Sequence, residues 1–108
     1  MKPVAFGLAL GVLLVSAAGA ETTDIADLRP GMSVTLTGTV ERVMDEDEFE
    51  LADGTGRVRV YVGPNPVPAA EGETLTVIGT VDDDLPLEVY ATGAVLADGT
   101  EVSFPYRY

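Results

Sequence analysis

The stretch EFELADGTGRVRV, residues 48–60, carries the clearest structural pattern in the sequence. Acidic and apolar residues alternate in EFEL, and arginine and valine alternate in RVRV. Alternation with a period of two, carried by β-branched and aromatic residues, is typical of a strand with one face buried. The DGTG between the two segments supplies glycines, which tolerate the positive φ of a tight turn. The stretch therefore predicts a β-hairpin.

The same alternation recurs on both sides of this hairpin. Apolar residues or glycine occupy every second position of Val34–Val40, Leu75–Val81 and Leu87–Val95. The turn sequence LADGT, residues 51–55, recurs at residues 96–100 and leads into a short segment that ends at Phe104. Prolines lack the N–H that a sheet needs, so GPNPVPAAEG, residues 63–72, is a connection. The sequence predicts an all-β domain with five main strands and a short sixth.

Two of the strands share a glycine at the same point. TLTGTV, residues 35–40, is echoed by TVIGTV, residues 76–81. A glycine inside a strand indicates a bend, a bulge or a close approach of another backbone. Two bent strands that lie side by side would close a small barrel. Before them, Asp24–Leu28 is long enough for one helical turn, which Pro30 and Gly31 end.

Residues 1–20 have the pattern of a secretory signal peptide. Lys2 precedes an apolar run from Val4 to Ala18, and AGA at residues 18–20 provides small residues for cleavage. A transmembrane anchor needs about 20 apolar residues, and this run is shorter. We expect cleavage after Ala20, export, and no membrane insertion of the mature chain.

The mature chain is then divided into three parts. Residues 21–32 form the helical turn and a linker, residues 33–104 form the barrel domain, and residues 105–108 form a frayed tail. A domain of this length can build one small core.

The charge of the chain excludes several functions. There are 18 acidic residues against 6 basic ones, and the net charge is −12. Proteins bind nucleic acids through lysine and arginine, so we expect no nucleic-acid partner.

Histidine and cysteine are absent from the sequence, and its one lysine is Lys2. Most enzymes rely on such side chains near neutral pH, so we expect no catalysis. Transition metals prefer the nitrogen of histidine and the sulfur of cysteine as ligands, so the sequence lacks the side chains for such a site.

The strand and turn motifs together resemble a known family. DEFELADGTGRVRV at residues 47–60, preceded by LTGTV and followed by VIGTVD at residues 77–82, is similar to the bacterial OB-fold (BOF) family, the exported stress-tolerance proteins of the YdeI/YgiW type. The resemblance covers residues 25–96. It implies a five-stranded OB-fold Greek-key barrel, a periplasmic location, a stress or envelope role, and ligand binding without catalysis.

The chain departs from this family at two places. Members commonly carry a tryptophan and lysines after the third strand, whereas this chain has no tryptophan and has Pro64, Pro66 and Pro68 there. The C-terminal hairpin that reaches Phe104 extends beyond the usual end of the domain. Both departures concern the ligand surface and leave the fold unchanged.

Two acidic clusters give the candidate site. MDEDEFE, residues 44–50, contains five carboxylates, and DDD stands at residues 82–84. Within the first cluster, Glu48-Phe49-Glu50 is ordinary strand alternation, which leaves residues 44–47 for the loop. The spacing does not match an EF-hand loop. If the loop starts at Asp45, its fifth position, which should be acidic, is Phe49.

In an OB fold, the loops between strands 1 and 2 and between strands 4 and 5 flank the usual binding face. These are the loops in which the two clusters fall, and a cleft lined with one sign of charge attracts counter-ions. The residues of the candidate site are Asp45, Glu46, Asp47, Asp82, Asp83 and Asp84.

Three interpretations of these loops remain open at this point. They bind a basic peptide or protein, they bind a divalent cation such as Ca²⁺ weakly, or they are simply solvated. We expect a monomer without a cofactor. The alternative is an assembly protein that uses a sheet edge around residues 102–104.

Two further sets of residues receive plain structural interpretations. Arg57 and Arg59 lie on the outer face of one strand, where they either pair with Glu48 and Glu50 across the hairpin or form a positive patch. The four tyrosines look too scattered in the sequence for a stacking platform. They are Tyr61, Tyr90, Tyr106 and Tyr108.

Overall fold

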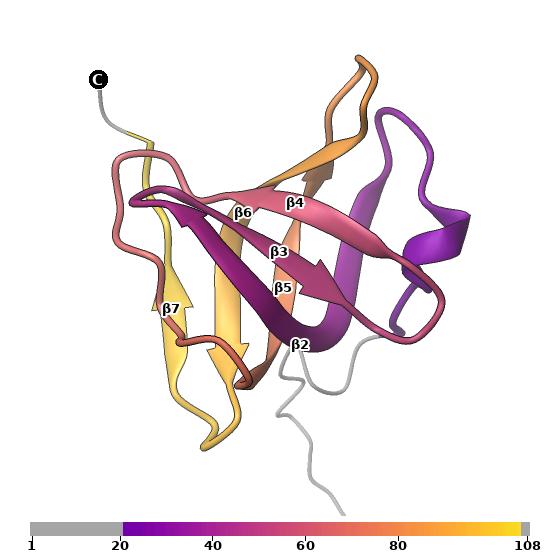
Figure 1. Cartoon of the computed structure of the whole chain (residues 1–108). Helices are drawn as coiled ribbons and strands as arrows, with labels where there is room; N and C mark the ends of the chain where they lie inside the picture. The colour runs from indigo at the N-terminus through magenta and orange to yellow at the C-terminus, as the bar shows by residue number, and fades with distance from the viewer. Residues whose placement is uncertain (1–20, 107–108) are drawn as a thin grey trace, which may run out of the picture.

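The computed structural model describes residues 21–106, and its strands form one sheet (Figure 1). The elements are the 3-10 turn η3 (Ile25–Asp27) and the strands β2 (Ser33–Asp45), β3 (Glu48–Ala52), β4 (Arg57–Tyr61), β5 (Thr74–Val81), β6 (Glu88–Leu96) and β7 (Glu101–Ser103). The predicted all-β class is confirmed, and the predicted helical turn is the 3-10 turn η3.

The sheet closes into a barrel of five strands. Its order is β4-β3-β2-β5-β6-β7, and a parallel pairing between β4 and β6 completes the ring. Strand β7 pairs with β6 outside that ring. The predicted small barrel with an extra C-terminal strand is therefore confirmed.

Strand β2 serves two neighbours along its length. Its first half pairs with β5 from Ser33 to Thr39, and its second half pairs with β3 from Thr39 to Asp45. Figure 1 shows β2 curving around the barrel between these partners. Two bulges, near residues 41 and 44, interrupt the pairing with β3 and add twist to the strand.

The expected loop at residues 44–47 is shorter in the structure. Strand β2 continues to Asp45, which pairs with Glu48, so only Glu46 and Asp47 form the turn. The sequence expectation was wrong here because the acidic residues broke the apolar alternation. The bulges absorb that break and let the ladder continue.

Glycine in the two echoed strands provides space for another backbone. A Cβ on Gly38 would collide with the carbonyl oxygen of Ala52, and one on Gly79 would collide with that of Tyr90. Strands β2 and β5 do lie side by side, as the echo predicted. Because they are antiparallel, the two glycines fall at opposite ends of their pairing, one against β3 and one against β6.

The interior of the barrel is filled by the alternating apolar residues. The core comprises Ile25, Leu28, Val34, Leu36, Val40, Phe49, Leu51, Val58, Val60, Val62, Leu75, Val77, Val81, Val89, Ala91, Ala94 and Phe104. None of its members is polar or charged. Full burial of each large side chain contributes about 1.5–3 kcal/mol before conformational entropy is counted.

The turn between β3 and β4 anchors η3. Asp53 Oδ1 accepts hydrogen bonds from Thr55 N at 2.8 Å and Thr55 Oγ1 at 2.6 Å, and Asp53 Oδ2 accepts one from Ile25 N at 2.8 Å. Burial raises the pKa of Asp53, but these hydrogen bonds outweigh it and lower the pKa overall. The turn therefore holds the N-terminal segment over one end of the barrel.

The chain after β7 remains attached to the barrel. Phe104 is buried, and its N–H donates to the Thr92 carbonyl at 3.0 Å. The Tyr106 hydroxyl lies 2.8 Å from the carbonyl oxygen of Ala91. The expectation of a frayed tail from residue 105 is therefore wrong for Tyr106, and Tyr108 lies outside the described residues.

The signal-peptide prediction for residues 1–20 also lies outside the described residues. Within residues 21–106, no helix is long and apolar enough to cross a membrane.

Candidate ligand-binding face

The outer face of β3, β4 and β6 collects acidic and aromatic side chains. In the register of the sheet, Glu48 pairs with Tyr61, and Tyr61 pairs with Tyr90. Alternate residues of these strands point into the core, so the residues between them point outward. We call Glu48, Tyr61, Glu88 and Tyr90 the acidic–aromatic face.

Three of the tyrosines form one cluster. The ring centroids of Tyr61 and Tyr90 are 5.8 Å apart with the planes at 66°, and those of Tyr61 and Tyr106 are 6.2 Å apart. The expectation that the tyrosines are scattered is therefore wrong for these three. Residues 29 and 45 positions apart meet because β4 and β6 run parallel and the chain after β7 returns across them.

Glu48 and Glu88 form a carboxyl pair at the centre of this face. Burial, a hydrogen bond with Glu48 and the charge of Glu48 together raise the pKa of Glu88 to about 7. Arg59 lowers this pKa, but it does not compensate. A hydrogen bond between two carboxyl groups requires a proton, so near neutral pH this pair carries less than its full negative charge.

A shallow hollow of about 380 Å³ lies over this pair. It is lined by the four residues of the acidic–aromatic face and by Asp47 from the turn after β2. Tyr90 is 39% exposed, so part of its ring is open to solvent. A hollow with carboxylates and aromatic rings is suited to a positively charged organic group, which both can attract.

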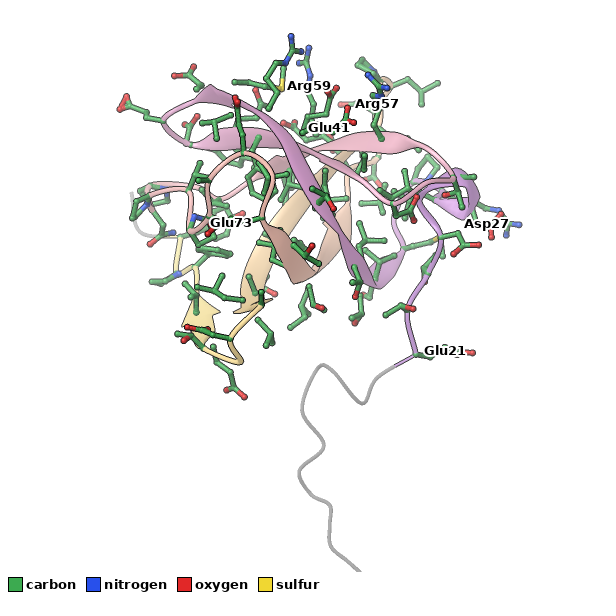
Figure 2. The ribbon with its side chains drawn as sticks, turned by 60° about the horizontal axis from the view of Figure 1, so that its bottom comes forward. Glu21, Asp27, Glu41, Arg57, Arg59 and Glu73 are labelled. Carbon is green, nitrogen blue, oxygen red and sulfur yellow. The ribbon has the colours of Figure 1, made fainter. Side chains whose placement is uncertain are left out.

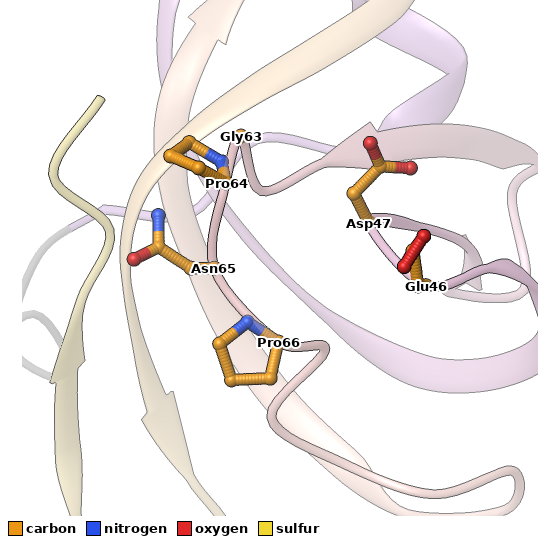
Figure 3. A pocket seen from close by; sticks show the side chains of 6 residues that line it. All are labelled: Glu46, Asp47, Gly63, Pro64, Asn65 and Pro66. Carbon is orange, nitrogen blue, oxygen red and sulfur yellow. The ribbon is translucent and has the colours of Figure 1, made fainter. Parts of the chain in front are cut away.

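A second hollow, of about 470 Å³, adjoins the first. Glu46 and Asp47 line one side, and Gly63, Pro64, Asn65 and Pro66 line the other (Figure 3). We call it the proline hollow. Asp47 lines both hollows, so the two lie next to each other.

Hydrogen bonds fix the loop that carries the prolines. Asn65 Nδ2 donates to the carbonyl oxygens of Val62 at 2.8 Å and Pro105 at 3.0 Å. Val62 N donates to the Asp47 carbonyl oxygen at 3.0 Å, which joins this loop to the turn after β2. The walls of the proline hollow are therefore held in place without a ligand.

The first predicted acidic cluster is only partly at these hollows. Glu46 lines the proline hollow and Asp47 lines both. Asp45 is the last residue of β2, and its Oδ1 accepts the N–H of Glu46 at 2.8 Å.

The second predicted cluster borders the face from the loop between β5 and β6. Asp82 Oδ2 accepts from the Tyr90 hydroxyl at 3.3 Å, and Asp82 Oδ1 accepts from Asp83 N at 2.7 Å. Burial raises the pKa of Tyr90, and the charges of Asp82, Glu88 and Asp84 raise it as well. Asp83 lies beside Gly31. The two clusters are thus connected through the acidic–aromatic face.

The carboxylates do not gather around a single point. Among residues 21–106, no group of three or more acidic side chains is placed to hold a metal ion. The acidic residues instead lie along the face, from the turn after β2 to the loop after β5.

The fold also has relatives of known structure. The structure of the hypothetical protein ygiW from E. coli has 24% sequence identity and a TM-score of 0.60, and the match covers 70% of this chain and 89% of that one. The OBody AM1L10, solved bound to hen egg-white lysozyme, has 18% identity and a TM-score of 0.60, with 71% and 93% covered.

This chain has a YgiW-type OB fold. The resemblance that the strand and turn motifs indicated is therefore confirmed at the level of the fold. No family model matches the sequence, and it has no significant similarity to a curated protein sequence.

In OB-fold terms, β3 and β4 are the second and third strands, which together with their flanking loops form the usual binding face. Sequence reasoning found those loops but missed Glu48, Glu88, Tyr61 and Tyr90. From the sequence, Glu48 is interpreted as part of the strand alternation and as a possible partner of the arginines. The signal that could have found this set is the parallel pairing of the third and fifth strands of an OB barrel, which brings residues 59–61 beside residues 88–90.

The sequence leaves open whether Arg57 and Arg59 pair with Glu48 and Glu50 or form a positive patch. The structure answers this question only in part. Arg57 forms an ion pair with Glu41 at 3.5 Å (Figure 2), and not with Glu48 or Glu50. Arg59 lies opposite Glu50 on β3 and opposite Glu88 on β6. Acidic residues of β2, β3 and β6 therefore surround the two arginines.

Proposed function

We propose that this protein is an exported, periplasmic OB-fold binding protein, stress or envelope related, which binds a cationic ligand on its acidic–aromatic face. The observation that carries the proposal is the hollow in which Asp47, Glu48 and Glu88 line the same space as two tyrosine rings. The ligand is a basic peptide or protein, or a divalent cation.

Electrostatics support a cationic ligand. The carboxyl groups of Glu48 and Glu88 are close enough to share a proton, as the raised pKa of Glu88 indicates. A bound cation would replace that proton and remove the repulsion between the two carboxylates. The net charge of −12 adds a long-range attraction that increases the association rate at low salt.

The binding role is also supported by the fold. The OBody AM1L10 shows that an OB-fold domain of similar size binds another protein. In this chain, the absence of histidine and cysteine supports binding without catalysis.

Export rests on the signal-peptide pattern of residues 1–20. Fractionation of expressing cells, followed by mass spectrometry of the mature N-terminus, tests it. A periplasmic protein that begins at Glu21 supports export, and an uncleaved cytoplasmic chain contradicts it.

Calorimetric titration tests the binding role. Wild type is titrated with Ca²⁺ and with a cationic peptide, beside Glu88→Gln and a variant neutralised at Asp45, Asp47, Asp82, Asp83 and Asp84. We expect both variants to weaken cation binding by at least about tenfold, because a hydrogen bond to a charged group contributes on the order of 1.5–3 kcal/mol. Glu101→Gln on β7 is the matched control for loss of one charge. Identical titrations for all four proteins would contradict the proposal.

The alternative function is assembly through a sheet edge. Within residues 21–106, β7 pairs only with β6, so its other edge is open. That edge is three residues long, and short edge strands resist pairing with other chains. Light scattering over a range of concentrations tests it: a dimer would favour assembly, and a monomer throughout would favour the ligand-binding role.

A further inference from the structure

We propose that the cationic ligand is an extended basic peptide, which lies across the proline hollow and the acidic–aromatic face and places one arginine or lysine side chain between Glu48 and Glu88. This inference rests on the proposed function and specifies the class of ligand. Its basis is the position of Asp47, which lines both the proline hollow and the hollow of the acidic–aromatic face.

The proline hollow has two kinds of wall. Pro64 and Pro66 supply apolar surface opposite Glu46 and Asp47 (Figure 3). Arginine and lysine have the same duality, because an apolar stem carries a charged head group. A basic peptide can therefore place its stems on the prolines and its head groups toward the carboxylates.

The proline hollow is formed in advance of binding. Proline restricts φ, and Asn65 holds the proline loop through its two hydrogen bonds. Gly63 has a φ of 67°, and a Cβ there would lie 2.8 Å from the ring of Tyr106. The loop is thus locked against the C-terminal segment, and a ligand would lose little affinity to ordering it.

The tyrosines favour an organic cation. Tyr61 and Tyr90 stand edge to face, and the Tyr90 hydroxyl is held by Asp82. An ammonium or guanidinium group near an aromatic ring gains cation–π attraction in addition to its contacts with carboxylates. The planar guanidinium has five donors, so it can bridge two carboxyl groups at once.

The charged groups around the carboxyl pair leave it without full neutralisation. Asp47 and Asp82 add negative charge, Tyr61 and Tyr90 add phenol groups, and Arg59 is the cation that lies opposite Glu88. The pKa of Glu88 stays raised despite Arg59, so Arg59 does not neutralise the carboxyl pair. The pair can therefore attract a second positive charge.

The spread of the carboxylates separates a peptide from a metal ion. The divalent cation Ca²⁺ needs six to eight oxygen ligands around one point. Among the residues that the structure describes, no acidic group of that kind exists. Carboxylates placed along a groove instead match a ligand with several separated charges.

The test uses an eight-residue peptide of alternating arginine and glycine, with a serine–glycine peptide and Ca²⁺ as comparators. Each is titrated by calorimetry into wild type, Tyr90→Leu, the double variant Pro64→Ala and Pro66→Ala, and Glu101→Gln as control. Thermal melts followed by circular dichroism confirm that each variant is folded. We expect at least about a fivefold loss of peptide affinity in Tyr90→Leu, about a threefold loss in the proline variant, and no change in the control.

A second measurement reports on the carboxyl pair directly. Titration at pH 7 in two buffers of different ionisation enthalpy gives the number of protons released. We expect about half a proton per bound peptide in wild type, because a group with a pKa near 7 is half protonated there. Glu88→Gln should abolish this release.

The outcomes distinguish failure of the peptide inference from failure of the proposed function. Tight Ca²⁺ binding without peptide binding, or peptide binding that neither Tyr90→Leu nor the proline variant weakens, would overturn the inference and leave a cationic ligand in place. Absence of binding by both the peptide and Ca²⁺ would overturn the proposed function itself.

Discussion

The two copies of LADGT, residues 51–55 and 96–100, form the same local turn in different tertiary settings. Gly54 and Gly99 both have a φ of 91°. Asp53 Oδ1 accepts the N–H of Thr55 at 2.8 Å, and Asp98 Oδ1 accepts that of Thr100 at 2.9 Å. Five residues are thus sufficient to specify a turn.

The two turns differ in what lies beyond them. The first turn closes the hairpin of β3 and β4, its Asp53 binds the N–H of Ile25, and Thr55 Oγ1 accepts the N–H of Ala26 at 3.1 Å. The second turn joins β6 to β7 outside the barrel ring. Identical turns therefore contribute unequally to the stability of the protein, because the neighbouring segments determine which further contacts each turn makes.

The largest difference should come from the leucine of each copy. Leu51 is completely buried, whereas Leu96 is only partly buried against the core. We expect Leu51→Ala to lower the free energy of unfolding by about 2–5 kcal/mol and Leu96→Ala by about 1 kcal/mol. Urea unfolding of the two variants measures both values. Equal losses would show that the two hairpins contribute alike to the core.

The aspartates should differ by a smaller amount. Asp53→Ala removes hydrogen bonds within the turn and the one to η3, and we expect a loss of about 1–2 kcal/mol. Asp98→Ala removes only the bonds within its own exposed turn, so its urea midpoint should remain close to that of wild type. A larger loss for Asp98→Ala than for Asp53→Ala would contradict the anchoring role of the first turn.

The pH dependence of stability should report on the role of Asp53 in the first turn. The pKa of Asp53 is below its usual value of 3.8 in the folded state. A lowered pKa contributes stability that is present above the unfolded value and is lost as the pH falls through the folded value. Asp53→Asn should therefore flatten the stability curve below about pH 4. A curve that keeps the wild-type slope would rule out Asp53 as its source.

The glycines allow the smallest and most local comparison. Gly54 and Gly99 share the same positive φ, and a Cβ would meet no atom within 4 Å at either position. Alanine should cost about 1 kcal/mol at both sites through backbone strain alone. Melting temperatures of Gly54→Ala and Gly99→Ala should therefore shift alike. Unequal shifts would mean that the two turns differ in their local geometry as well as in their surroundings.

The acidic loops show how far sequence reasoning reached at the candidate site. Asp47 and Asp82 do border the acidic–aromatic face, one from each predicted loop. Asp45 instead belongs to β2, since pairing with β3 continues through two bulges that no local pattern reveals. Glu88 and Tyr90 could not be assigned to the site from local sequence, because they reach Glu48 and Tyr61 only through the parallel pairing of β4 and β6.

The strands, most of the turns and the excess of negative charge could be predicted from the amino-acid sequence. These depend on alternation, on glycine at positive φ and on composition, all of which are local or additive. Barrel closure is needed to explain which turn anchors η3, how the tyrosines cluster, and why Glu48 and Glu88 form a pair. Each of these depends on contacts between residues far apart in the chain, and barrel closure brings those residues together.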